Sequence, residues 1–114
     1  MSLGAQIAAR RKEQRRVIEV QQWAEDDAPM LLYVGAITAG DIDKLQRKHK
    51  NFLNDMTIAG MVDLIIMKAE IEDGSRAFTL EDKAILMREP VALISDIAGQ
   101  MFGDVVDIEE AEKN

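Results

Sequence analysis

The chain has 114 residues, a formal net charge of −7 and no cysteine. This length suits one domain, and the lack of cysteine excludes disulfides, thiolate metal sites and thiol nucleophiles. Hydrophobic residues make up 47% of the chain but aromatic residues only 4%, so we expect a core of aliphatic side chains and methionine. The sequence has no secretion signal and no apolar run long enough for a bilayer, which predicts a soluble cytoplasmic protein with no membrane partner.

The two ends of the chain carry opposite charge. We expect a mobile basic arm over residues 1–15, a single globular domain over 16–103 and a mobile acidic tail over 104–114. Solvated ends are the simpler interpretation of these charges. The alternative is that the head of one subunit attracts the tail of another, through Arg10, Arg11, Arg15, Arg16, Glu109 and Glu110.

Two β-branched and aromatic segments predict a hairpin. The first begins at Arg16 and contains Trp23, and the second covers Met30 to Ile37. Residues 25–29, which include two aspartates and a proline, are typical of a turn. Because a lone hairpin is marginal in water, we expect an α+β fold, mainly helical, with an N-terminal β-hairpin packed on about four helices.

Two helices are predicted next. Residues 38–41 have the form of a capping box, and the first helix runs from there to about Lys50, with Phe52 on its apolar face. The second starts near residue 54 and runs to about Glu70. It has two apolar stripes, so it is either central in the domain or covered by a partner; the second stripe contains Leu64, Met67 and Ile71.

Two shorter helical segments complete the domain. Thr79 and the acidic residues after it predict the start of a third, short helix. Pro90 breaks that helix and is well placed as the first residue of a fourth, and Gly103 is a plausible stop. The core stripe of the fourth helix is predicted to be Ile94, Ile97, Ala98 and Met101.

The sequence offers little for catalysis. His49 is the single histidine, and we expect it at the edge of the core, because a general base needs an orienting partner and a reacting group. The sequence around Asp73-Gly74 does not match a calcium-binding loop. With Gly74 at the invariant glycine, Ala69 and Leu80 occupy the first and last positions, where carboxylates are needed. Phosphate-binding loops and nucleophile elbows are absent. We therefore predict a protein that is not an enzyme and has no cofactor or metal.

Nucleic-acid binding is the alternative of a different class. The arginine-rich arm and the helix from Lys44 to Lys50 place several cations where they would meet phosphates. The chain would then be a small DNA-binding regulatory protein. The negative net charge and the lack of a recognised binding motif favour a protein partner and no nucleic acid.

The order of these elements resembles the tail assembly chaperones of long-tailed, siphovirus-type bacteriophages. The resemblance covers roughly residues 16–103. It depends mostly on the run Ile37-Thr38-Ala39-Gly40-Asp41-Ile42-Asp43-Lys44-Leu45, and on Asp73-Gly74, Phe78, Glu81-Asp82 and Pro90. It implies a chaperone that coats the tape-measure protein, helps recruit tail tube subunits, acts in the cytoplasm of the bacterial host and is absent from the mature virion.

A long apolar helix aggregates in water unless its apolar stripe is covered, and methionine-rich surfaces adapt to varied partners. We predict a partner-binding surface that contains Leu64, Met67, Ile71, Met87, Val91 and Phe102. For each residue taken singly, a place in the core is the competing interpretation.

The resemblance also implies self-association into a homo-oligomer and a longer form made by ribosomal slippage. The chain ends in Glu112-Lys113-Asn114, which can be encoded GAA AAA AAC and then contains the slippery heptamer A AAA AAC. We predict a −1 frameshift there that yields a minor, longer partner of the chain.

Overall fold

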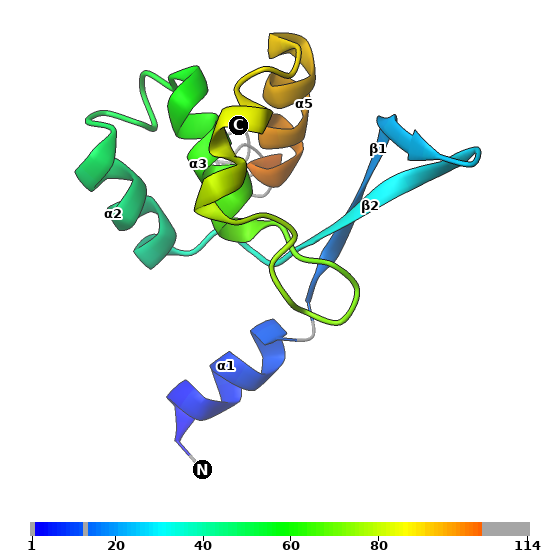
Figure 1. Ribbon diagram of the computed structural model, residues 1–114. Helices are drawn as coiled ribbons and strands as arrows, with labels where there is room; N and C mark the ends of the chain where they lie inside the picture. Colours follow the sequence, from blue (N-terminus) through cyan, green and yellow to red (C-terminus); the bar gives the residue numbers. More distant parts are fainter. Residues whose placement is uncertain (1, 13, 104–114) are drawn as a thin grey trace, which may run out of the picture.

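The computed structural model describes residues 2–12 and 14–103. Figure 1 shows α2 to α5 gathered in one body, with the hairpin and α1 leading away from it. This α+β, mainly helical arrangement with an N-terminal hairpin confirms the predicted fold class. The elements in order are α1 (Leu3–Lys12), β1 (Arg16–Glu25), β2 (Ala28–Val34), α2 (Ala39–Lys48), α3 (Ile58–Lys68), the 3-10 turn η1 (Leu80–Asp82), α4 (Lys83–Leu86) and α5 (Val91–Met101).

The hairpin presents one face to the core. Ile18 lies opposite Leu32 in the antiparallel ladder, and both are buried. The turn is shorter than predicted, because Glu25 already pairs with Ala28. Its two central residues, Asp26 and Asp27, have φ values of 50° and 66°. Both therefore lie in the left-handed region that a tight hairpin turn requires and that aspartate tolerates better than most residues.

The predicted capping box opens α2. The Thr38 hydroxyl accepts a hydrogen bond from the Asp41 N–H at 3.1 Å, and the Asp41 carboxylate accepts one from the Thr38 N–H at 2.9 Å. The helix ends at Lys48, two residues before the predicted end, and Asn51 follows with a φ of 59°. Phe52 is buried as expected, but it lies on the turn after the helix and not on its stripe.

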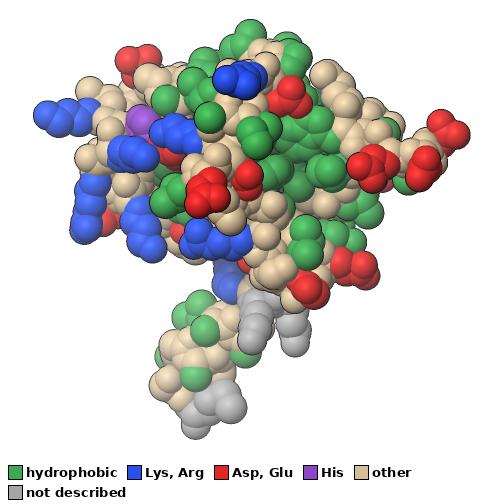
Figure 2. Space-filling model, viewed as in Figure 1, with side chains coloured by type: hydrophobic (Ala, Val, Ile, Leu, Met, Phe, Trp, Pro, Cys, Tyr) green, Lys and Arg blue, Asp and Glu red, His purple; other side chains and the backbone are tan. Residues whose placement is uncertain are grey.

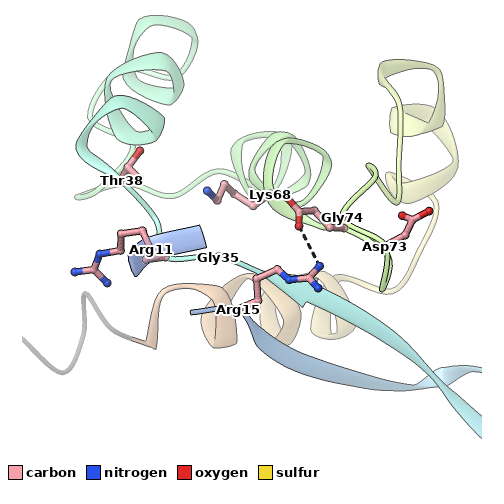
Figure 3. A pocket seen from close by; sticks show the side chains of 9 residues that line it. Arg11, Arg15, Gly35, Thr38, Lys68, Asp73 and Gly74 are labelled. Carbon is pink, nitrogen blue, oxygen red and sulfur yellow. Dashed lines mark hydrogen bonds and ion pairs between the residues drawn. The ribbon is translucent and has the colours of Figure 1, made fainter. Parts of the chain in front are cut away.

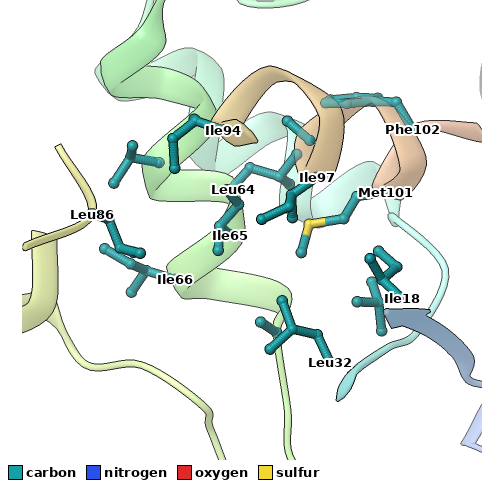
Figure 4. Close-up of a cluster of buried hydrophobic side chains, with 14 of the residues drawn as sticks. Ile18, Leu32, Leu64, Ile65, Ile66, Leu86, Ile94, Ile97, Met101 and Phe102 are labelled. Atoms are coloured by element: carbon teal, nitrogen blue, oxygen red, sulfur yellow. The ribbon is translucent and has the colours of Figure 1, made fainter. Parts of the chain in front are cut away.

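Helix α3 is the centre of the domain. It begins at Ile58, later than predicted, because the Thr57 hydroxyl caps it by accepting from the Gly60 N–H. Both of its apolar stripes contribute to the core, as Figure 4 shows for Leu64 and its neighbours on α3 and α5. Of the two interpretations of this helix, the structure therefore supports a central position in the domain.

The last helices follow the prediction closely. The Asp82 carboxylate accepts from the Thr79 N–H at 2.8 Å, which opens a segment of only one 3-10 turn and one α-helical turn. Pro90 directly precedes α5 and does not form its first residue. The four residues predicted for the α5 core stripe are all buried.

The packing of α3 on Phe52 yields a stability prediction. A Cβ at Gly60 would lie 2.6 Å from Cε2 of Phe52, whereas a Cβ at Gly99 would meet nothing within 4 Å. Gly60→Ala should lower the free energy of unfolding by about 1–3 kcal/mol through overpacking. Gly99→Ala, in an exposed position of α5, should raise it by roughly 0.5–1 kcal/mol. Urea denaturation measures both, and equal effects would contradict this packing.

Candidate protein-binding site

The structure divides the six residues predicted for partner binding. Leu64 and Phe102 are 0% and 2% exposed, so they are core residues and cannot contact a partner. Leu64 faces the core because α3 is covered on all sides, and Phe102 closes the end of α5 with its ring centroid 5.8 Å from that of Phe52. Met67 is half-buried, whereas Ile71, Met87 and Val91 are exposed.

Among the exposed apolar residues that the sequence analysis missed, two lie close to Met87 and Val91 in the sequence. Leu80 and Ile85 are 72% and 64% exposed, and they belong to the same segment as Met87 and Val91, which are 45% and 58% exposed. We call Leu80, Ile85, Met87 and Val91 the apolar ridge. These four large apolar side chains lie within twelve residues of the chain, and an exposed apolar patch is typical of a binding site. A single helical turn has too few residues for its periodicity to show which side chains face solvent.

A buried carboxylate, that of Asp63, lies on α3. Asp63 Oδ2 is 2.6 Å from His49 Nε2 and 3.2 Å from Lys48 Nζ, and Oδ1 is 3.0 Å from Lys83 Nζ. The lysine at Oδ1 is held by charge and not by a well-aligned hydrogen bond. Asp63 thereby joins α3 to the end of α2 and the start of α4. His49 lies at the edge of the core, as predicted.

Burial alone would raise the pKa of the Asp63 carboxyl. The hydrogen bond from His49 and the ammonium groups of Lys83 and Lys48 outweigh burial, so the pKa lies below its ordinary value. The pKa of Asp41 is lowered in the same way, because Lys68 Nζ, 2.8 Å from Oδ2, together with the capping bonds to Thr38, outweighs its burial. Both groups are therefore ionised at neutral pH.

Beside Asp63 lies a pocket of about 220 Å³ between α2, α3 and η1, which we call the basic pocket. Lys44, Lys48 and Arg76 supply exposed cations to its lining, while Leu45, Ile66, Met67 and Leu80 supply apolar surface. Figure 2 shows lysine and arginine side chains gathered on this side of the molecule. The pocket therefore combines positive charge with an apolar contact area.

The arginines predicted for self-association are not equivalent. Arg15 lies 3.4 Å from Glu70 Oε1, donates to the Glu72 carbonyl at 2.9 Å and covers the Tyr33 ring. Arg16 donates to the last carbonyls of α5, where a cation also suits the helix dipole. These two arginines therefore hold the domain together. Arg10 and Arg11 on α1 are exposed, and Glu109 and Glu110 lie outside the described residues.

Arg11 and Arg15 also line a cavity of about 470 Å³, together with residues from 35–38 and 68–74 (Figure 3). The dashed line in Figure 3 marks the pair between Arg15 and Glu70. The ammonium group of Lys68 in this cavity is paired with Asp41. Most of the cavity's charge is thus neutralised within the protein.

Comparison of the chain with protein-family models, curated proteins and solved structures finds no match. In the part of the chain that the structure describes, no group of three or more His, Asp or Glu side chains is placed to hold a metal ion. Within the same residues, no helix has the length and apolar character needed to cross a membrane. The apolar ridge and the basic pocket are accordingly the two candidate binding features.

The Asp63 cluster predicts a pH-dependent stability. Asp63→Asn removes the charge but keeps the shape, and it should lower the free energy of unfolding at pH 7 by about 1–3 kcal/mol. Asp43→Asn is the control, since Asp43 pairs with Arg47 on the exposed face of α2 and is worth at most about 0.5 kcal/mol.

The sign of the pH effect follows from the lowered pKa. As pH falls through 3.8, the ordinary value for aspartate, the unfolded chain takes up the proton first, so stability decreases. The difference between the wild type and Asp63→Asn should therefore shrink as the pH falls below that value. A difference that persists unchanged at pH 3 in urea titrations would show that the charge of Asp63 is not what stabilises the fold.

Proposed function

We propose that this protein is a tail assembly chaperone of a siphovirus-type bacteriophage, which binds the tape-measure protein and helps recruit tail tube subunits around it. It acts in the cytoplasm of the bacterial host and is absent from the mature virion. The apolar ridge is the observation that carries the proposal. Together with the order of elements over residues 16–103, it supports a protein that works by reversible binding of an apolar helical partner.

The ridge has the properties that this task needs. A tape-measure protein is a long helical chain, and its apolar stripe must be covered until the tube forms around it. The ridge presents a leucine on η1, an isoleucine on α4, a methionine directly after α4 and a valine at the start of α5, with Met67 and Ile71 as further contacts from α3 and the loop after it. Unbranched methionine adapts to successive turns of a helix that differ slightly in shape.

The ridge gives a direct test with a matched control. Ile85→Ser with Val91→Ser should weaken binding of the tape-measure protein by roughly tenfold to a hundredfold per residue, because each side chain loses about 1.5–3 kcal/mol of burial. Leu53→Ser with Met56→Ser removes two exposed apolar residues elsewhere, which are 41% and 38% exposed. Calorimetric titration and the yield of soluble tape-measure protein in co-expression measure the effect. Equal losses of affinity in both double variants would contradict a specific role of the ridge in binding.

The proposal includes a longer form of the chain. We expect the gene to read A AAA AAC across the codons for Glu112, Lys113 and Asn114, followed by an open −1 frame, and we expect a minor longer product in infected cells. Sequencing of the gene and mass spectrometry of the products test this directly. A non-slippery sequence without a downstream frame would leave protein binding as the proposed function but withdraw the frameshifted partner.

A DNA-binding regulatory role remains the second candidate because the exposed face of α2 is basic. The cations on it are partly neutralised, since Arg47 lies 2.8 Å from Asp43 and Lys48 lies 3.2 Å from Asp63. Phosphate binding weakens steeply with salt, whereas apolar capture does not. Tight binding of duplex DNA at low salt that is lost at moderate salt would favour this second function over the chaperone.

A further inference from the structure

The turn of the hairpin is an exposed acidic point on a stable element. Glu25, Asp26 and Asp27 are all exposed, and Figure 1 shows that the turn lies at the far end of the hairpin from the helical body. The ladder pairs Arg16–Val20 with Met30–Val34, its register shifts between Val20 and Glu25, and the pair of Glu25 with Ala28 closes the turn. The left-handed conformation of both aspartates holds their backbone in one geometry. We call these three residues the acidic tip.

The basic pocket has the complementary chemistry. Lys44, Lys48 and Arg76 line it, and Lys83 lies behind it against Asp63. Lys48 and Lys83 pair with Asp63, whereas Lys44 and Arg76 add two more cations to the region, which therefore keeps a positive charge in a chain whose net charge is −7. Its volume of about 220 Å³ is below that of pockets for drug-sized ligands. The side chains of a protruding turn suit a pocket of this size better than a whole ligand would.

Apolar residues lie next to both the acidic tip and the basic pocket. Met30 follows the acidic tip on β2 and is exposed, and Leu80 and Met67 line the basic pocket. A turn that enters the pocket would bring a methionine close to a leucine and a second methionine. Charge complementarity would then set the orientation and the association rate, and apolar burial would add affinity.

The two features cannot meet within one molecule. Figures 1 and 2 place the acidic tip at one side of the molecule and the basic face of α2 at the other. We infer that the acidic tip of one copy of this chain docks into the basic pocket of a second copy. The contact is head-to-tail, so in a pair of copies one keeps a free pocket and the other a free tip. Repetition of the contact gives an open filament or a closed ring.

This inference does not depend on the proposed function. Of the apolar ridge, only Leu80 also lines the basic pocket, so Ile85, Met87 and Val91 stay available to another partner. It also differs from the self-association predicted from the charged ends. Arg15 and Arg16, which that prediction needs, are held within the domain.

Complementation between two variants tests the contact. The tip variant carries Asp26→Asn and Asp27→Asn, since asparagine keeps the left-handed turn without the charge. The pocket variant carries Lys44→Gln and Arg76→Gln, which alter exposed residues only. In sedimentation velocity at low salt, the wild type should form concentration-dependent oligomers and each variant alone should be a monomer. An equimolar mixture should form dimers and nothing larger, because it offers one intact tip and one intact pocket.

Two controls separate this contact from its competitors. Lys50→Gln with Arg88→Gln removes two exposed cations that do not line the pocket, and it should associate as the wild type does. Glu109→Gln with Glu110→Gln neutralises part of the acidic tail of the full chain and should also leave association unchanged. If this last variant is monomeric while the tip variant still associates, the tail is the occupant and the inference is wrong. A wild type that is monomeric at every concentration would overturn it as well.

Discussion

The burial of α3 from all sides is the constraint on which the rest of the structure depends. An apolar helix of eleven residues can be central in so small a domain only if other elements surround it. Helices α2, α4 and α5 all pack against it, and the strand residues Ile18 and Leu32 complete the same core. Each aliphatic side chain buried in this way contributes about 1.5–3 kcal/mol, which is why a chain with few aromatic residues can still form a single core.

Asp63 is the one buried charged side chain of α3, and three basic residues gather around it. A carboxylate at this depth must be paired, or it would lose far more in hydration than it gains. The pairing draws Lys48 and His49 from α2 and Lys83 from α4 to the same point. Lys48 also lines the basic pocket beside it, so the pairing of Asp63 places one of the three cations of that pocket.

Local signals in the sequence predicted much of the fold. The capping residues Thr38 and Thr79, the alternation of β1 and the stripe of α5 each act over a few residues, so the sequence reveals them directly. Leu64 and Phe102 were predicted at the binding surface but are buried. Their exposure depends on which elements cover them, and periodicity does not contain that information. The same holds for Arg15 and Arg16, whose partners lie more than fifty residues away.

The position of the apolar ridge follows from the same competition for the core. The segment from Leu80 to Val91 contains only one short α-helical turn, and of its large apolar residues only Leu86 reaches the core. So short an element cannot turn all its apolar side chains inward, and α3 and α5 already fill the space behind it. The ridge therefore stays at the surface without straining the fold, while the net charge of −7 opposes non-specific association through it. A small domain with a saturated core thus leaves apolar side chains exposed on the segment that joins α3 to α5.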